Sequence, residues 1–398
     1  MGKVPWITIV GIGEDGPSGL TSASREALES AEIIMGPKRH LELIGYTTPR
    51  QIEWPVPFSD GIGVLRGLEG RNVAVLASGD PFWFSAGRAI STAFKRDEWR
   101  ALPVPSVFSL AASRLGWPIE DTLCIGLHAA PLARLRPHLA PGLRAIVLLR
   151  DGLAVPDLAS YLASLGFCGS TLTVCEALGG PRERISTVSV AEARKGGFKH
   201  PVGVAVEVAG NGVIVPLASG RPDELFETDG VMTKRPVRAL TLSALAPRAG
   251  ENLWDIGGGS GTIAVEWALA HPTCSASVIE QRADRVALIR ANADAFGLNR
   301  ITIVQGAAMD VLDGLPAPDA VFIGGGLTAP LLERIAKLPA GTRIVANAVT
   351  LEAEALLTQA HADHGGDLLR IEIARATPLG QKRGWTSAYP VVQWSVTL

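Results

Sequence analysis

The chain has 398 residues, which is longer than a single hydrophobic core usually grows, so two domains are expected. Hydrophobic residues make up 47% and charged residues 19%, with 44 Gly and 27 Pro, a composition typical of a soluble α/β protein with many tight turns. The formal net charge of -2 provides no overall positive field, so we expect no nucleic-acid partner.

Cysteine spacing and hydropathy bear on the cellular compartment. The four cysteines form no CxxC pair, which indicates reduced thiols rather than a zinc site or disulfides, so no metal is expected; they are Cys124, Cys168, Cys175 and Cys274. No segment stays apolar for the roughly 20 residues that a bilayer span needs, and the first residues lack the pattern of a secretory leader. The sequence therefore predicts a cytoplasmic protein without membrane contact.

The first part of the chain, residues 1–215, alternates short apolar runs with helical segments. Strands are predicted at 6–13, 32–36 and 72–80, with a helix that begins after Thr21 as its N-cap. After a Pro-rich stretch the pattern restarts as a second lobe, with helices near 109–115 and 157–166 and strands at 145–149, 170–178 and 203–210. Because strands alternate with helices, a mainly parallel sheet is expected.

A second alternation follows a segment that is rich in Pro, Gly and acidic residues. This segment, 216–232, lacks apolar periodicity and is predicted to be the linker before a domain at 233–398. Five strands are expected there, at 252–256, 276–280, 301–306, 319–325 and 342–349. Two further strand-like runs, LLRIEIARA and YPVVQWSV, come after the last helix. Their position suits an antiparallel pair at the edge of the sheet.

A glycine-rich turn, LWDIGGGSGT, joins the first of these strands to a helix. It contains Gly257, Gly258, Gly259, Ser260 and Gly261, and glycine is needed there because a Cβ would block both the turn and the approach of a ligand. The motif alone also fits a merely tight turn. Glu280 ends the next strand, where an acid can accept hydrogen bonds from both hydroxyls of a ribose.

The third and fourth strands end in segments that would border the same crevice. Backbone groups beside Ala307 and Ala308 can meet an adenine edge, and FIGGG closes the fourth strand. A dinucleotide site of an oxidoreductase is the competing interpretation. The glycine spacing differs from G-x-G-x-x-G, no second half-site for a nicotinamide is visible, and the final antiparallel pair favours a methyltransferase.

This arrangement resembles the class I S-adenosylmethionine methyltransferases, which have a Rossmann-like fold, over about residues 233–398. MTKRPVRALTLSAL, LWDIGGGSGTIAVEWA, FIGGG and ARATPLGQKRGW are similar to segments of the precorrin C15-methyltransferases, a family that also decarboxylates the C12 acetate side chain. The resemblance implies cofactor contacts at Thr233, at 257–261, at Glu280 and at Ala308.

The N-terminal segments VGIGEDGPSGLT and LASGDPFWFSAG resemble the tetrapyrrole methylases, class III enzymes that bind S-adenosylmethionine between two α/β lobes. The chain departs from that family at Glu14, where Pro is usual, and at PSVF, where a Pro-Gly-x-Ser-like turn is usual. The resemblance implies cofactor contacts at Gly13, Ser78, Gly79, Asp80, Phe108 and Ser109.

Together the halves resemble a C5-methylase-like domain fused to a C15-methylase-like domain of cobalamin biosynthesis. This implies methylation of a precorrin-6-type tetrapyrrole at C5 and C15, decarboxylation, and one S-adenosylmethionine site per domain. A homo-oligomer is also expected. The alternative is a class I methyltransferase that acts on RNA or another substrate, with the N-terminal half as a non-catalytic scaffold.

The expected substrate carries several carboxylates, for which Arg is the natural ligand because its planar fork binds them bidentately. Arg235 and Arg238 precede the first strand of the C-terminal domain, and Lys382 and Arg383 lie in a Gly-flanked loop. These four are predicted to contact substrate, although each could instead be a solvated surface charge. A sulfonium methyl is already activated, so no nucleophilic side chain is required and no catalytic residue is assigned.

Overall fold

The computed structural model describes residues 5–45 and 50–398 and divides into two compact units. One unit comprises residues 1–130 and 140–213, and the other comprises 131–139 and 214–398. Among the described residues, no helix combines the length and the apolar character that crossing a bilayer requires.

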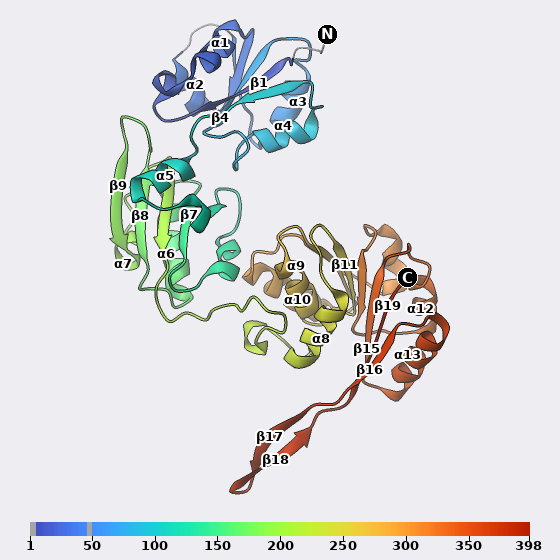
Figure 1. Ribbon diagram of the computed structural model, residues 1–398. Coiled ribbons are helices and arrows are strands. Elements are labelled where there is room, and N and C mark those ends of the chain that lie inside the picture. Colours follow the sequence, from blue (N-terminus) through green and yellow to red (C-terminus); the bar gives the residue numbers. More distant parts are fainter. Residues whose placement is uncertain (1–4, 46–49) are drawn as a thin grey trace. The chain divides into compact units, whose positions relative to one another are not determined.

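The first lobe of the N-terminal unit is a five-stranded parallel sheet in the order β3-β2-β4-β1-β5 (Figure 1). Its strands are β1 Ile7–Ile12, β2 Ile33–Gly36, β3 Arg50–Glu53, β4 Val73–Ser78 and β5 Trp99–Leu102. Its helices are α1 Ser22–Ser30, α2 Lys38–Ile44, α3 Asp60–Arg66 and α4 Gly87–Ala93. Ile12 pairs with Ser78, and the N–H of Gly79 donates to the carbonyl of Ile12 at 3.0 Å. The loops that follow β1 and β4 therefore lie side by side.

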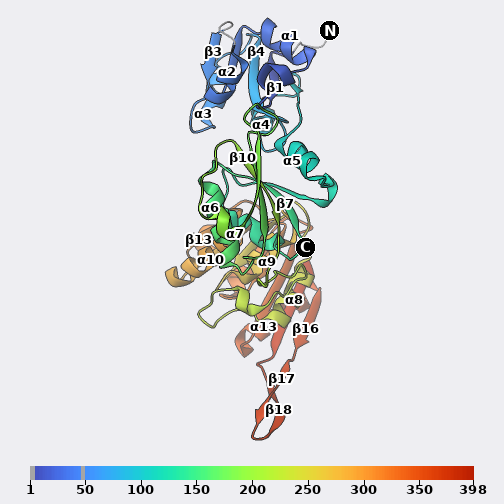
Figure 2. The ribbon, with the colours of Figure 1, turned by 90° about the vertical axis from the view of Figure 1, so that its left-hand side faces the viewer.

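The second lobe is a mixed sheet in the order β6-β7-β10-β8-β9, in which only β6 and β7 are parallel. Its strands β7 and β10 are labelled in Figure 2. Its strands are β6 Leu123–Gly126, β7 Arg144–Leu148, β8 Thr171–Glu176, β9 Arg184–Ser189 and β10 Val202–Glu207. Its helices are α5 Val107–Leu115, α6 Ala154–Ser164 and α7 Val190–Ala193. The expectation of a mainly parallel sheet does not hold here. β9 follows β8 through a short turn, and strands joined without a crossover must run antiparallel.

The C-terminal unit contains a seven-stranded sheet in the order β13-β12-β11-β14-β15-β19-β16. Its strands are β11 Asn252–Ile256, β12 Ser275–Glu280, β13 Ile301–Gln305, β14 Ala320–Ile323, β15 Arg343–Ala348, β16 Asp367–Ile371 and β19 Val391–Thr397. Its helices are α8 Arg235–Leu245, α9 Thr262–Ala270, α10 Ala283–Ala295, α11 Ala308–Val311, α12 Ala329–Ile335 and α13 Leu351–His364. β19 runs antiparallel to both β15 and β16, which confirms the predicted antiparallel pair.

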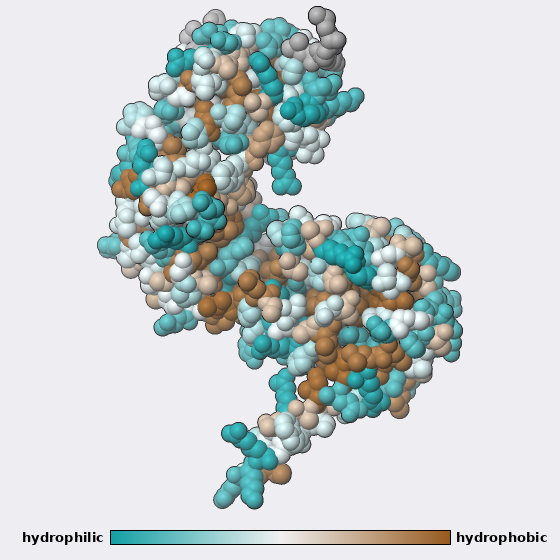
Figure 3. Space-filling model, in the orientation of Figure 1, coloured by the Kyte–Doolittle hydropathy of each residue, from teal (hydrophilic) through white to brown (hydrophobic). Residues whose placement is uncertain are grey.

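A two-stranded hairpin, β17 Ala374–Leu379 and β18 Lys382–Ser387, is inserted between β16 and β19 and projects from the sheet (Figure 1). The sequence predicted one strand over 368–376, but β16 ends at Ile371 and β17 starts a separate sheet. Hydrophilic residues predominate toward the hairpin tip (Figure 3). Even so, Leu379 and Trp385 are 70% and 78% exposed.

The segment 216–232, expected to be a linker, packs on the C-terminal unit. The backbone N–H groups of Gly220 and Arg221 donate to the fully buried carboxylate of Glu266 at 2.8 and 2.9 Å. Phe226 joins the core cluster that contains α9. Single, widely spaced residues anchor the segment. The second unit therefore includes it and, apart from residues 131–139, begins at Ile214.

Candidate active sites

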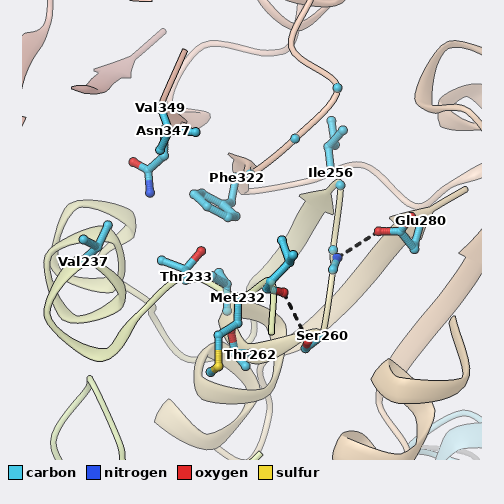
Figure 4. A pocket seen from close by; sticks show the side chains of 18 of the residues that line it. Met232, Thr233, Val237, Ile256, Ser260, Thr262, Glu280, Phe322, Asn347 and Val349 are labelled. Carbon is cyan, nitrogen blue, oxygen red and sulfur yellow. Dashed lines mark hydrogen bonds between the residues drawn. The ribbon is translucent and has the colours of Figure 1, made fainter. Parts of the chain in front are cut away.

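A pocket of about 920 Å³ opens at the carboxyl ends of β11, β12 and β14 (Figure 4). Open α/β sheets bind ligands at this edge. Its lining includes every predicted cofactor residue of the domain except Gly261, namely Thr233, Gly257, Gly258, Gly259, Ser260, Glu280, Ala307 and Ala308. The structure therefore brings together residues that lie far apart in the sequence.

The glycines of this loop are required by its geometry. Gly257 has φ +72°, and a Cβ there would lie 2.7 Å from the backbone nitrogen of Gly325. Gly261 has φ +73°, and its Cβ would lie 2.9 Å from a side-chain carbon of Ile289. Gly257 thus allows the loop after β11 to pack closely on the loop after β14, and Gly261 allows it to pack closely on α10.

Glu280 is held rigidly at the pocket edge. Its carboxylate accepts a backbone N–H bond from Gly259 at 2.9 Å (Figure 4). It also accepts backbone N–H bonds from Gln281 at 2.9 Å and from Arg282 at 3.0 Å. The residue is 6% exposed. A carboxylate has about four acceptor positions, so it can still accept a hydrogen bond from a hydroxyl group in the pocket.

Asp255, which precedes the glycine loop, is buried away from the pocket lining. Its Oδ2 atom accepts a hydrogen bond from the N–H of Ala264 at 3.2 Å, while Oδ1 has no partner among the described residues. Burial raises the pKa of this carboxyl to about 7, and the charge of Glu280 adds to the rise. The residue fixes the start of α9 rather than contacting a ligand. Nowhere in 5–45 and 50–398 do three His, Cys, Asp or Glu side chains gather as a metal ion would need.

The other end of the pocket contains residues that the sequence did not single out. Asn347 of β15 donates to Thr241 Oγ1 and accepts from Gln393 Nε2, both at 2.9 Å, so its amide is fixed. Arg375 of β17 and Tyr389, which follows β18, also line this end. The available signal for Asn347 was its position near the carboxyl end of a predicted sheet strand. Arg375 lies inside a segment that was recognised, but no local pattern distinguishes it from its neighbours.

The pocket lining includes none of the four predicted substrate cations. Arg238 is fully buried, and its guanidinium donates to Glu266 at 2.6 Å and to Asp223 at 2.9 Å. Its role here is to hold the 221–233 segment against α9. Arg235 is exposed at the start of α8, and the last two, Lys382 and Arg383, are exposed at the hairpin tip.

A second pocket, of about 350 Å³, lies within the N-terminal unit, between its two lobes. The predicted cofactor residues Gly13, Ser78, Gly79 and Phe108 line it. Asp80 and Ser109 do not. Asp80 accepts the N–H of Phe82 at 2.8 Å, and Ser109 bonds to the helix N-cap Ser106. Both therefore shape the loops whose other residues face the pocket.

Charged and ionisable residues from both lobes also line this second pocket. They are Glu14, Arg39, His128, Arg150 and His200. Burial lowers the pKa of His128 and His200, so both rings are neutral near pH 7. The sequence marked only Glu14, as a departure from a family pattern, because the others lie outside any local motif.

Two family profiles match the chain. The one described as "Precorrin methyltransferase domain" matches residues 224–398, and "Tetrapyrrole (Corrin/Porphyrin) Methylases" matches 7–194. Precorrin-6Y C(5,15)-methyltransferase [decarboxylating] of Sinorhizobium sp is 49% identical over 99% of this chain and 96% of its own. The Mycobacterium tuberculosis (strain ATCC 25618 / H37Rv) protein of the same name is 42% identical over 98% and 99%. A probable cobalt-precorrin-6B C(15)-methyltransferase (decarboxylating) of Pyrobaculum calidifontis is 37% identical over 43% of this chain and 92% of its own.

Proposed function

The chain belongs to the decarboxylating precorrin-6Y C(5,15)-methyltransferases, and from this premise we propose a division of labour between its domains. The N-terminal domain methylates C5 of a precorrin-6-type tetrapyrrole, and the C-terminal domain methylates C15 and removes the carboxyl group of the C12 acetate. The observation that carries the proposal is the C-terminal pocket, in which Glu280 is bonded to the glycine loop at the carboxyl edge of the sheet. A class I enzyme for RNA is not favoured, because the relatives match over nearly the whole chain.

Each domain is proposed to hold its own S-adenosylmethionine. In the C-terminal pocket the fit is supported by the remaining acceptor capacity of Glu280, which suits a ribose, and by the glycine loop, which at Gly257 approaches the Gly325 backbone too closely for a Cβ. Backbone groups of Ala307 and Ala308 are available to an adenine edge. When bound, the cofactor supplies an activated methyl group. The chain's own task is then to hold the acceptor carbon in line and to exclude water.

The end of the C-terminal pocket beside Arg375 and Tyr389 is proposed to take the tetrapyrrole. Ile373, Val349 and Val391 line the same end and suit an apolar ring system, while Arg375 suits a ring carboxylate. Loss of carbon dioxide leaves an electron pair that the conjugated macrocycle accepts. The carboxylate that leaves should not be bound tightly, because ground-state binding does not accelerate the step.

The predicted substrate cations that lie outside the pocket are proposed to make only peripheral contacts with the substrate. Arg235, Lys382 and Arg383 are retained as contacts to substrate carboxylates that extend beyond the pocket, since all three are exposed. Arg238 is left out because its donors already serve Glu266, Asp223 and neighbouring carbonyl groups.

The test is a single incubation of the intact protein with a precorrin-6-type substrate and S-adenosylmethionine, followed by mass analysis of the product. We expect two added methyl groups and the loss of one carboxyl group. Arg375→Ala should slow C15 methylation and decarboxylation without changing C5 methylation, and the exposed Arg290→Ala serves as the control. Retention of the carboxyl group by the wild-type protein would contradict the assigned reaction.

We further propose that the protein is a homo-oligomer and that it is located in the cytoplasm. Leu379, Trp385 and Tyr389 are largely exposed on or beside the hairpin, and its outer strand edges are open to pairing. The cysteines are free thiols, which supports a reducing compartment. Sedimentation analysis of Trp385→Ser should show a smaller assembly than wild type, and an unchanged assembly would exclude the hairpin as the contact.

A further inference from the structure

A buried carboxylate with two more exposed arginine partners borders the N-terminal pocket. Glu14, which follows β1, is 9% exposed and pairs with Arg39 at the start of α2. It also pairs with Arg182, in the turn between β8 and β9, at 3.1 Å. The Arg39 side chain is 29% exposed and lines the pocket. Its guanidinium is therefore partly desolvated, yet it remains open to a ligand.

A neutral histidine holds the other side of this guanidinium. His40 is 4% exposed, and burial, with a smaller contribution from Arg39, lowers the pKa of its ring to about 3. Its Nε2 atom lies 2.8 Å from Nη2 of Arg39. Arg can only donate, so Nε2 accepts and the ring proton lies on Nδ1. His40 thus orients Arg39 without neutralising its charge.

The pocket border carries an excess of positive charge. Glu14 is shared between Arg39 and Arg182, and Asp151 pairs with Arg150 at 2.9 Å, so these carboxylates do not balance the guanidinium groups. Burial and the charge of Arg182 both lower the pKa of Arg39, which reflects this imbalance. An anionic ligand would relieve it.

We propose that Arg39 binds a ligand carboxylate in the N-terminal pocket, with Glu14 and His40 as positioning residues that fix its guanidinium. Arg has five N–H donors, so its contacts with Glu14 and His40 leave donors for a bidentate carboxylate. A cation that is already oriented loses little freedom on binding. The inference rests on the proposed function, which supplies carboxylates from two sources: the acetate or propionate groups of the tetrapyrrole and the methionine part of S-adenosylmethionine.

The experiment measures C5 methylation by the intact protein, with the tetrapyrrole and S-adenosylmethionine each varied in turn. C15 methylation in the same protein reports an intact fold. Arg39→Ala should raise the KM for the carboxylate ligand about tenfold or more, because a charged hydrogen-bond pair is lost, with a smaller change in kcat. Arg39→Lys should recover part of the loss, because it keeps the charge but not the fork. The control is Arg71→Ala, which removes a half-exposed ion pair with Glu32 in the same lobe.

The outcomes separate the two sources. A higher KM for the tetrapyrrole identifies a substrate side chain, and a higher KM for S-adenosylmethionine identifies the cofactor carboxylate. Unchanged KM values for both ligands in Arg39→Ala, with C15 methylation intact, would overturn the inference. If Arg39→Ala does not fold, wild-type KM values for both ligands in Arg39→Lys would overturn it. Failure of the wild-type protein to methylate C5 would contradict the proposed function instead.

Discussion

The carboxylate of Glu280 accepts the backbone N–H of Gly259 at 2.9 Å, and this bond joins the end of β12 to the loop that follows β11. The loop and the acid therefore form one rigid unit, although each was recognised separately in the sequence. Loss of the acid is expected to disturb the loop as well as any ligand contact.

The two proposed cofactor sites can be inactivated one at a time. Glu280→Ala removes the acceptor for three backbone N–H groups, so it should weaken S-adenosylmethionine binding in the C-terminal domain by about tenfold or more and stop C15 methylation. Asp80→Ala should impair only C5 methylation, because its carboxylate shapes the loop after β4. Mass analysis should find a singly methylated product from each variant.

The control for Glu280 is Glu352→Ala, an exposed acid on α13. It should give the doubly methylated product. If either site variant lost both methylations while still folded, the proposal of two independent sites would fail.

The glycine loop should tolerate no Cβ at its tightest point. Gly257→Ala would place a methyl group 2.7 Å from the Gly325 backbone at φ +72°, so we expect a clearly larger loss of Tm than backbone strain alone causes, together with loss of C15 methylation. Gly250→Ala is the matched control, since its φ of +86° is also unfavourable but nothing lies within 4 Å. It should cost only about 1–2 kcal/mol. Equal costs for the two variants would show that the collision does not matter.

Stability should depend on the ionisation of Asp255. Its pKa is raised from 3.8 to about 7 by burial, so the folded state prefers the protonated carboxyl. The stabilisation is complete below the unfolded pKa near 4 and is lost as the pH rises through about 7, on the order of a few kcal/mol. Thermal unfolding of wild type and Asp255→Asn at pH 5 and pH 8 tests this, because the opposite pH dependence of buried His40, whose pKa is lowered to about 3, cancels in the comparison. The variant should gain stability relative to wild type between pH 5 and pH 8, whereas the exposed Asp294→Asn should show no such relative gain. Equal shifts for Asp255→Asn and wild type would exclude this carboxyl as a source of the pH dependence.

The chain should separate best at 213/214. A C-terminal fragment that begins at Ile214 keeps the bonds from Gly220 and Arg221 to Glu266, whereas one that begins at Val231 leaves that buried carboxylate with fewer donors. We expect the longer fragment to have the higher Tm and to methylate C15. The shorter fragment is the comparison, and equal Tm values would mean that the segment contributes nothing.

The sequence predicted the parts of the site that depend on local geometry. Gly257 and Glu280 lie at strand ends, and the local sequence of a strand end is enough to predict its turn. Their positions at the pocket could therefore be predicted. Arg238 was predicted to contact substrate because nothing local indicates that Glu266 will bury it. Arg39 and Arg375 were missed for the same reason, since only tertiary packing brings them to a pocket.

The hairpin has a consequence for regulation. Arg375 of β17 and Tyr389 after β18 line the pocket at its base, while the far end of the same paired strands is exposed. If self-association through that end shifts Arg375 or Tyr389, it would be coupled to the proposed substrate binding at the base, and such coupling is reciprocal. Substrate would then raise the association constant of the assembly, and assembly would raise the affinity for substrate by the same factor. The apparent substrate affinity of the C-terminal domain would therefore vary with protein concentration.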